Sequence, residues 1–94
     1  MKVLMIVIDD SKKEELEIFL NQRGVVGYTE ISQAAGMGLS GRRLGSRAFP
    51  QTSAVLFSIL SEEAVENVRQ GIEDFCASCS ERLRMVAWDV EELV

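Results

Sequence analysis

The residues with the clearest chemical potential are three arginines in a glycine-rich segment, residues 32–51. The segment reads SQAAGMGLSGRRLGSRAFPQ and holds no acidic residue, whereas the rest of the chain carries seven basic and fifteen acidic residues. Guanidinium groups form paired hydrogen bonds with phosphates and carboxylates. Arg42, Arg43 and Arg47 are therefore candidates for contact with an anion or a partner protein. The alternative is a solvated loop that balances acidic neighbours.

Two cysteines, Cys76 and Cys79, have C-x-x-C spacing. They fall near the end of a predicted helix, where the helix dipole disfavours a thiolate, and Cys79 continues an apolar stripe. Packing in the core is the simpler interpretation. A metal site is the alternative, and it would need cysteines from several subunits because the chain has no histidine. No nucleophile–base pair is visible, so we do not expect an enzyme.

Length and composition predict one small domain, residues 1–94, with a modest core. A net charge of −5 argues against nucleic acid as a partner. No apolar run approaches the length that spans a bilayer, and the N-terminus has no signal-peptide pattern. We therefore expect no direct membrane insertion and a cytoplasmic location.

The apolar pattern predicts four strands and two helices that would position these residues. Ser11 and Glu14 have capping-box spacing at the start of the first helix, and Gly24 suits its end. Ser61 is the predicted cap of the second helix. The inward face of that helix should be Val65, Val68, Ile72, Phe75 and Cys79. The strands are expected at residues 3–8, 25–31, 52–60 and 83–90, with 32–51 as a loop.

This order predicts an α+β, ferredoxin-like βαββαβ fold, a four-stranded antiparallel sheet with two helices on one face. The first and third strands are apolar on both alternating faces, as in strands that are buried on both sides. Two helices can cover one face alone. We therefore expect the second face to pack against other copies of the chain.

Four motifs in the correct order resemble the nitrogen-regulatory PII-like proteins, the superfamily that includes the CutA divalent-ion-tolerance proteins. They are the opening MKVLMIVI, the segment GVVGYTEI, the step Gly36-Met37-Gly38 and the late strand RMVAWDV. The resemblance runs nearly end to end. It implies a homotrimer with its sheets facing inward, and a mobile T-loop at residues 32–51 that signals to a protein target such as a transporter or an enzyme.

The resemblance also implies a small anionic effector, an adenine nucleotide in many members, bound between subunits. The positions that match the family's cleft are Gly27, Thr29, Gly36, Gly38 and Arg84. Residues 80–83 stand where the family has a glycine-rich phosphate-binding turn, which weakens the case for ATP.

The leading hypothesis is a non-enzymatic signalling protein of this type. A CutA-like metal-responsive protein that uses Cys76 and Cys79 is one alternative. A trimeric adaptor that presents the loop without any ligand is another.

Overall fold

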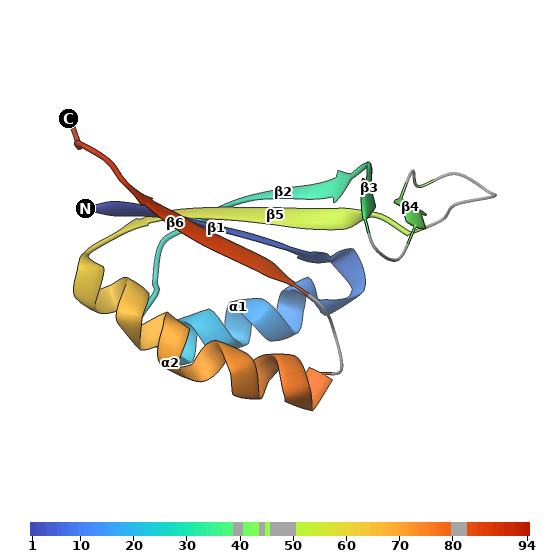
Figure 1. Ribbon diagram of the computed structural model, residues 1–94, viewed down its shortest axis with the longest axis horizontal. Coiled ribbons are helices and arrows are strands. Elements are labelled where there is room, and N and C mark those ends of the chain that lie inside the picture. The colour runs from blue at the N-terminus through green and yellow to red at the C-terminus, as the bar shows by residue number, and fades with distance from the viewer. Residues whose placement is uncertain (39–40, 44, 46–50, 80–82) are drawn as a thin grey trace.

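The computed structural model describes residues 1–38, 41–43, 45, 51–79 and 83–94. Its main sheet is antiparallel, with the strand order β2-β5-β1-β6, and both helices lie on one face of it (Figure 1). The predicted ferredoxin-like fold is therefore confirmed. The sheet contains β1 (Lys2–Asp9), β2 (Thr29–Ala34), β5 (Ser53–Leu60) and β6 (Arg84–Asp89), and the helices are α1 (Lys13–Gln22) and α2 (Glu62–Cys79).

The first helix begins differently from the prediction. A short 3-10 helix, η1 (Asp10–Lys12), precedes α1, and the Asp9 carboxylate accepts a hydrogen bond from the Ser11 amide at 2.9 Å. Asp9 is thus the capping residue, and the capping box assigned to Ser11 and Glu14 is wrong. The second helix does follow the prediction, since the Ser61 hydroxyl accepts from the Ala64 amide at 3.2 Å.

The end of α1 explains why the second strand starts late. Gly24 has a φ of 85°, and the Val25 amide donates to the Leu20 carbonyl at 2.9 Å, as in a Schellman motif. The buried hydroxyl of Ser58 then donates to the Gly27 carbonyl. These contacts hold residues 25–28 outside the ladder, so β2 begins at Thr29 and not at the predicted residue 25.

The core lies between the sheet and the helices. Leu16 and Leu20 of α1 are almost completely buried, and the rings of Phe19 and Phe75 join the two helices with centroids 5.1 Å apart. The predicted inward face of α2 is confirmed at Val68, Ile72 and Phe75. The side chain of Cys79 lies outside the described residues. The strands contribute Leu4, Ile6, Ile8, Ala54 and Leu56 to this core.

The opposite face of the sheet has no helix over it in Figure 1. Several cross-strand pairs on that face are apolar: Met5 pairs with Phe57 and with Val86, and Val3 pairs with Trp88. Trp88 is 44% exposed and Ile59 is 55% exposed. We call this surface the open face; its members are Val3, Met5, Val7, Ile31, Val55, Phe57, Ile59, Val86 and Trp88. A single chain leaves these apolar side chains partly in water, as the sequence predicts.

The segment 32–51 is not wholly a loop. Its first residues complete β2, and two short strands, β3 (Gly36–Gly38) and β4 (Gly41–Arg43), pair as a small ribbon. The ribbon lies at the end of the main sheet that is opposite the two termini (Figure 1). Among the described residues, no helix is long and apolar enough to cross a membrane.

Candidate functional site

The predicted effector residues divide between the two edges of the sheet. Thr29 pairs with Phe57 in edge strand β2, and Arg84 pairs with Val7 in edge strand β6. Both are exposed and both lie on the open face, since their partners alternate with buried residues. Three strand spacings place them about 14 Å apart across the sheet. One chain therefore does not bring Thr29 and Arg84 into a common site.

Gly27 and Gly36 belong with Thr29, at the β2 edge. A methyl group added at either glycine would meet nothing within 4 Å among the described residues, and neither has a positive φ. No described residue therefore approaches Gly27 closely at the position where a side chain would lie. Its carbonyl is held by the Ser58 hydroxyl, and its Cα hydrogens face open space.

Gly38, Arg42 and Arg43 follow in the β3–β4 ribbon. The backbones of Gly36 and Arg43 are paired, as are those of Met37 and Arg42. The side chains of Arg42 and Arg43, and the whole of Arg47, lie outside the described residues. The role predicted for the three arginines thus stays a prediction.

Cys76 lies in α2 and is half-buried against the core. This position fits the packing interpretation. Among the described residues, no group of three potential metal ligands is gathered. The metal role for Cys76 and Cys79 also stays a hypothesis.

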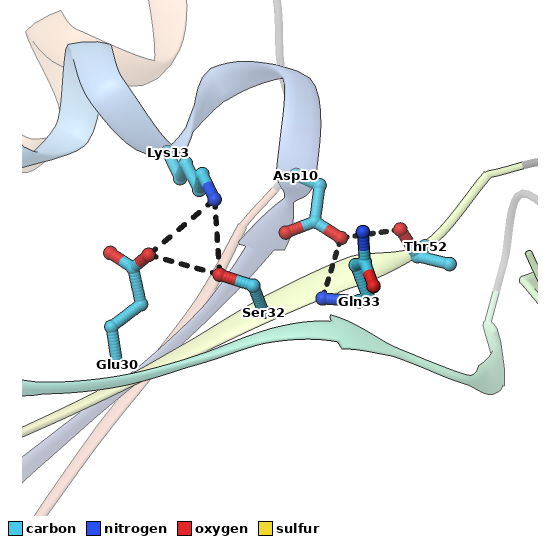
Figure 2. A network of polar contacts seen from close by, with 6 residues as sticks. All are labelled: Asp10, Lys13, Glu30, Ser32, Gln33 and Thr52. Atoms are coloured by element: carbon cyan, nitrogen blue, oxygen red, sulfur yellow. Dashed lines mark hydrogen bonds and ion pairs between the residues drawn. The ribbon is translucent and has the colours of Figure 1, made fainter.

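A polar network that the sequence analysis missed lies beside β2 on the helix side (Figure 2). Lys13 Nζ donates to Ser32 Oγ at 3.0 Å and lies 3.6 Å from Glu30 Oε1, and Ser32 Oγ donates to the same oxygen at 3.1 Å. Asp10 forms a second group with Gln33 and Thr52. In the sequence, Asp10 simply follows an apolar strand, and nothing in the spacing of Lys13, Glu30 and Ser32 signals their contact.

A second carboxyl group borders this network. Glu17 of α1 has its pKa raised, first because its protonated form donates a hydrogen bond to Glu30, and further by desolvation. The same contact lowers the pKa of Glu30, with help from Ser32 and Lys13. Glu30 Oε2 is buried and accepts no hydrogen bond from the described residues while Glu17 is ionised. One contact between the two carboxyl groups therefore shifts their pKa values in opposite directions.

Asp89, at the end of β6, forms an ion pair with Lys2, with Lys2 Nζ 2.8 Å from Asp89 Oδ1. The hydrogen bond from Lys2 lowers the pKa of Asp89 and raises that of Lys2. Asp89 is exposed, and Arg84, at the other end of β6, is the basic residue of that strand.

The family model for nitrogen regulatory protein P-II matches residues 1–87. The chain belongs to the P-II family. The resemblance inferred from the four motifs is thus confirmed, over nearly the whole chain. No curated protein sequence matches this chain.

Solved P-II relatives share the fold. CPII, a PII-like protein of Thiomonas intermedia K12, bound to ADP and bicarbonate, is 25% identical, with a TM-score of 0.72 over 95% of this chain and 86% of CPII. The apo form of CPII is 21% identical, with a TM-score of 0.65 over 95% of this chain and 89% of CPII. A PII-like signalling protein of Thermus thermophilus is 20% identical, with a TM-score of 0.73 over 95% and 85%.

Proposed function

We propose that this chain is a non-enzymatic P-II signalling protein of the cytoplasm. In this proposal it assembles as a homotrimer and binds a small anionic effector, an adenine nucleotide in the first instance, in a cleft between two subunits. The 32–51 segment then contacts a partner protein, such as a transporter or an enzyme. Arg42, Arg43 and Arg47 supply the basic contacts of that segment.

The observation that carries the proposal is the separation of Thr29 from Arg84. Each stands at an edge of the sheet, on the face that no helix covers. When the open faces of several copies pack around an axis, the β6 edge of one copy can approach the β2 edge of the next. Arg84 of one subunit then supplies a positive charge beside the backbone of Gly27 and Thr29 of its neighbour.

The empty space beside Gly27 and Gly36 supports the same cleft. Nothing in the described part of the chain requires glycine at these positions, because both have ordinary φ values and room for a methyl group. A glycine with no internal requirement suggests that another backbone or a ligand approaches it closely. Exposed amides at such a position can also hold phosphate oxygens.

The relative CPII supports the chemistry of the effector. CPII has been seen with ADP, AMP and bicarbonate bound. These ligands are all anions, as an arginine and free backbone amides would favour.

Calorimetric titration of the purified protein with ADP, AMP, ATP and bicarbonate tests the proposal. We expect saturable heat with at least one adenine nucleotide, at a stoichiometry near one per subunit. A folded trimer that gives no heat with any of them would contradict an adenine-nucleotide effector. Thiol titration of native protein with copper or zinc added would, in the same preparation, test the metal-responsive alternative.

A further inference from the structure

Strand β2 contains a β-bulge, and the proposed function does not explain why the bulge is there. Ile31 pairs with Val55 and Ala34 pairs with Ser53, so Ser32 and Gln33 together oppose the single residue Ala54. Such an insertion bends the strand and shifts every later side chain to the other face. The bulge lies between Thr29 and Gly36, and it therefore determines how these two parts of the proposed cleft are oriented.

The backbone at the bulge is strained. Gln33 has a φ of 58°, the left-handed region, and it is the sole non-glycine residue with a positive φ among the described residues. A side chain in that region costs free energy unless neighbouring contacts hold the conformation. Gln33 itself is exposed, so core packing does not supply those contacts.

The contacts come from Asp10, the first residue of η1, directly after β1. Asp10 Oδ2 accepts a hydrogen bond from the Gln33 amide at 2.9 Å and a second one from the Thr52 hydroxyl (Figure 2). The Asp10 amide donates to the Thr52 carbonyl at 3.1 Å, which extends the β1–β5 pairing by one more bond. The Asp10 carboxylate therefore joins Gln33, near the end of β2, to Thr52, the residue directly before β5.

We propose that Asp10 is a positioning residue for the effector cleft, because it fixes the bulge at Gln33 that carries the chain from Thr29 to Gly36. This inference rests on the proposed function. Asp10 acts through the Gln33 amide and the Thr52 hydroxyl, and it does not itself touch the effector. Ser32 is the second residue of the bulge. Lys13 supports the bulge there, because its ammonium group donates a hydrogen bond to Ser32 Oγ.

The geometry provides a matched pair of substitutions. Both hydrogen bonds end on Oδ2, whereas Asp10 Oδ1 is buried and accepts none from the described residues. Asp10→Asn keeps the accepting oxygen, and its amide nitrogen takes the buried Oδ1 position, which lowers stability because no described residue offers that nitrogen an acceptor. Asp10→Ala removes the acceptor. Thr52→Val, with Thr52→Ser as its control, removes one of the two donors without changing Asp10.

Two measurements on the full chain test the inference. Hydrogen exchange of the Gln33 amide, without nucleotide, should accelerate at least tenfold in Asp10→Ala and change little in Asp10→Asn. Affinity for ADP should fall at least tenfold in Asp10→Ala and recover in Asp10→Asn, while far-ultraviolet circular dichroism stays unchanged. Thr52→Val should move both quantities in the same direction, and Thr52→Ser should not. If Asp10→Ala does not fold, this Thr52 pair decides the question.

The outcomes separate the two proposals. Unchanged exchange at Gln33 in Asp10→Ala and in Thr52→Val would overturn the positioning role, whatever the protein binds. Accelerated exchange with unchanged ADP affinity would also overturn it, because the bulge would then not orient the cleft. Absence of ADP binding in the wild-type protein would instead refute the proposed function, and with it the link between the bulge and an effector.

Discussion

Thr29 and Arg84 lie on the same face of one sheet, on its opposite edge strands β2 and β6. The two inner strands, β5 and β1, separate them with a band of apolar side chains. No movement of side chains within one chain can bring the two residues together. We therefore propose that a site that uses both residues is built by two copies of the chain.

Replacing Arg84 by alanine should weaken effector binding. A charge-assisted hydrogen bond to a phosphate is worth about 1.5–3 kcal/mol, so we expect at least about a tenfold loss of ADP affinity. Arg69→Ala is the matched control, because Arg69 carries the same charge on α2 and pairs with Glu66, with Nη1 and Oε2 3.4 Å apart. Calorimetry of both variants makes the comparison. Equal affinities in the two variants would remove Arg84 from the cleft.

Gly27→Ala separates folding from binding. The added methyl group meets no atom of the described chain, so the free energy of unfolding should change by less than about 1 kcal/mol. ADP affinity should nevertheless fall, because the methyl group occupies the space that we assign to the cleft. Chemical unfolding and calorimetry on the same sample test this. A variant that binds ADP as well as the wild type would show that nothing approaches Gly27.

Phe57→Glu should prevent assembly. Phe57 lies at the centre of the open face, between Met5 and Thr29, and a charge buried there between subunits would be unpaired. The penalty for such a charge is several kcal/mol. Ile18→Glu is the control, because Ile18 is 60% exposed on α1. Sedimentation should report single subunits for Phe57→Glu and trimers for Ile18→Glu. Trimers in both cases would mean that the open face is not the interface.

The opposite pKa shifts of Glu17 and Glu30 predict opposite effects of two amide substitutions. The raised pKa of Glu17 means that its stabilising contribution is present below the ordinary glutamate pKa and is lost as the pH rises through the raised value. Glu17→Gln keeps a donor at every pH and should stabilise the fold at pH 7, with a gain that shrinks toward pH 4. Because Glu17 is partly exposed, the gain should stay below about 1 kcal/mol.

Glu30→Gln should do the reverse. The lowered pKa of Glu30 means that its contribution is present above the ordinary pKa and disappears as the pH falls through the lowered value. The substitution should destabilise the protein at pH 7 and have less effect in acid. Urea unfolding at several pH values measures both variants. Changes in stability of the same sign at pH 7 would rule out the contact between the two carboxyl groups.

Periodicity was enough to predict the sheet, the helices and the uncovered face. The runs around β1 and β5 alternate between two apolar faces, and the stripe of Val68, Ile72 and Phe75 identifies the inner side of α2. These features depend on local side-chain type and spacing. The start of β2 depends instead on a remote contact, the hydroxyl of Ser58 on the Gly27 carbonyl, which no local pattern encodes.

The bulge could not be predicted for a similar reason. Gln33 is neither glycine nor asparagine, the residues that normally signal a left-handed backbone. Its conformation is held by Asp10, 23 positions earlier in the chain. The capping role of Asp9 was missed because Ser11 offered a plausible local alternative, and the structure gives the side-chain acceptor to the residue two positions before it.

Mixing two variants with weakened binding tests the intersubunit cleft most directly. Arg84→Ala removes the β6 contribution, and Gly27→Phe fills the β2 side, so each variant alone should bind ADP at least about tenfold more weakly than the wild type. The two variants are then denatured together and refolded as mixed trimers. In each mixed trimer, one junction brings the intact β6 edge of a Gly27→Phe subunit against the intact β2 edge of an Arg84→Ala subunit. We predict that ADP binding returns in the mixture, at a stoichiometry near one per mixed trimer. Mixed trimers that still bind ADP as weakly as the two variants, while wild-type protein refolded in parallel does not, would contradict a cleft shared between subunits.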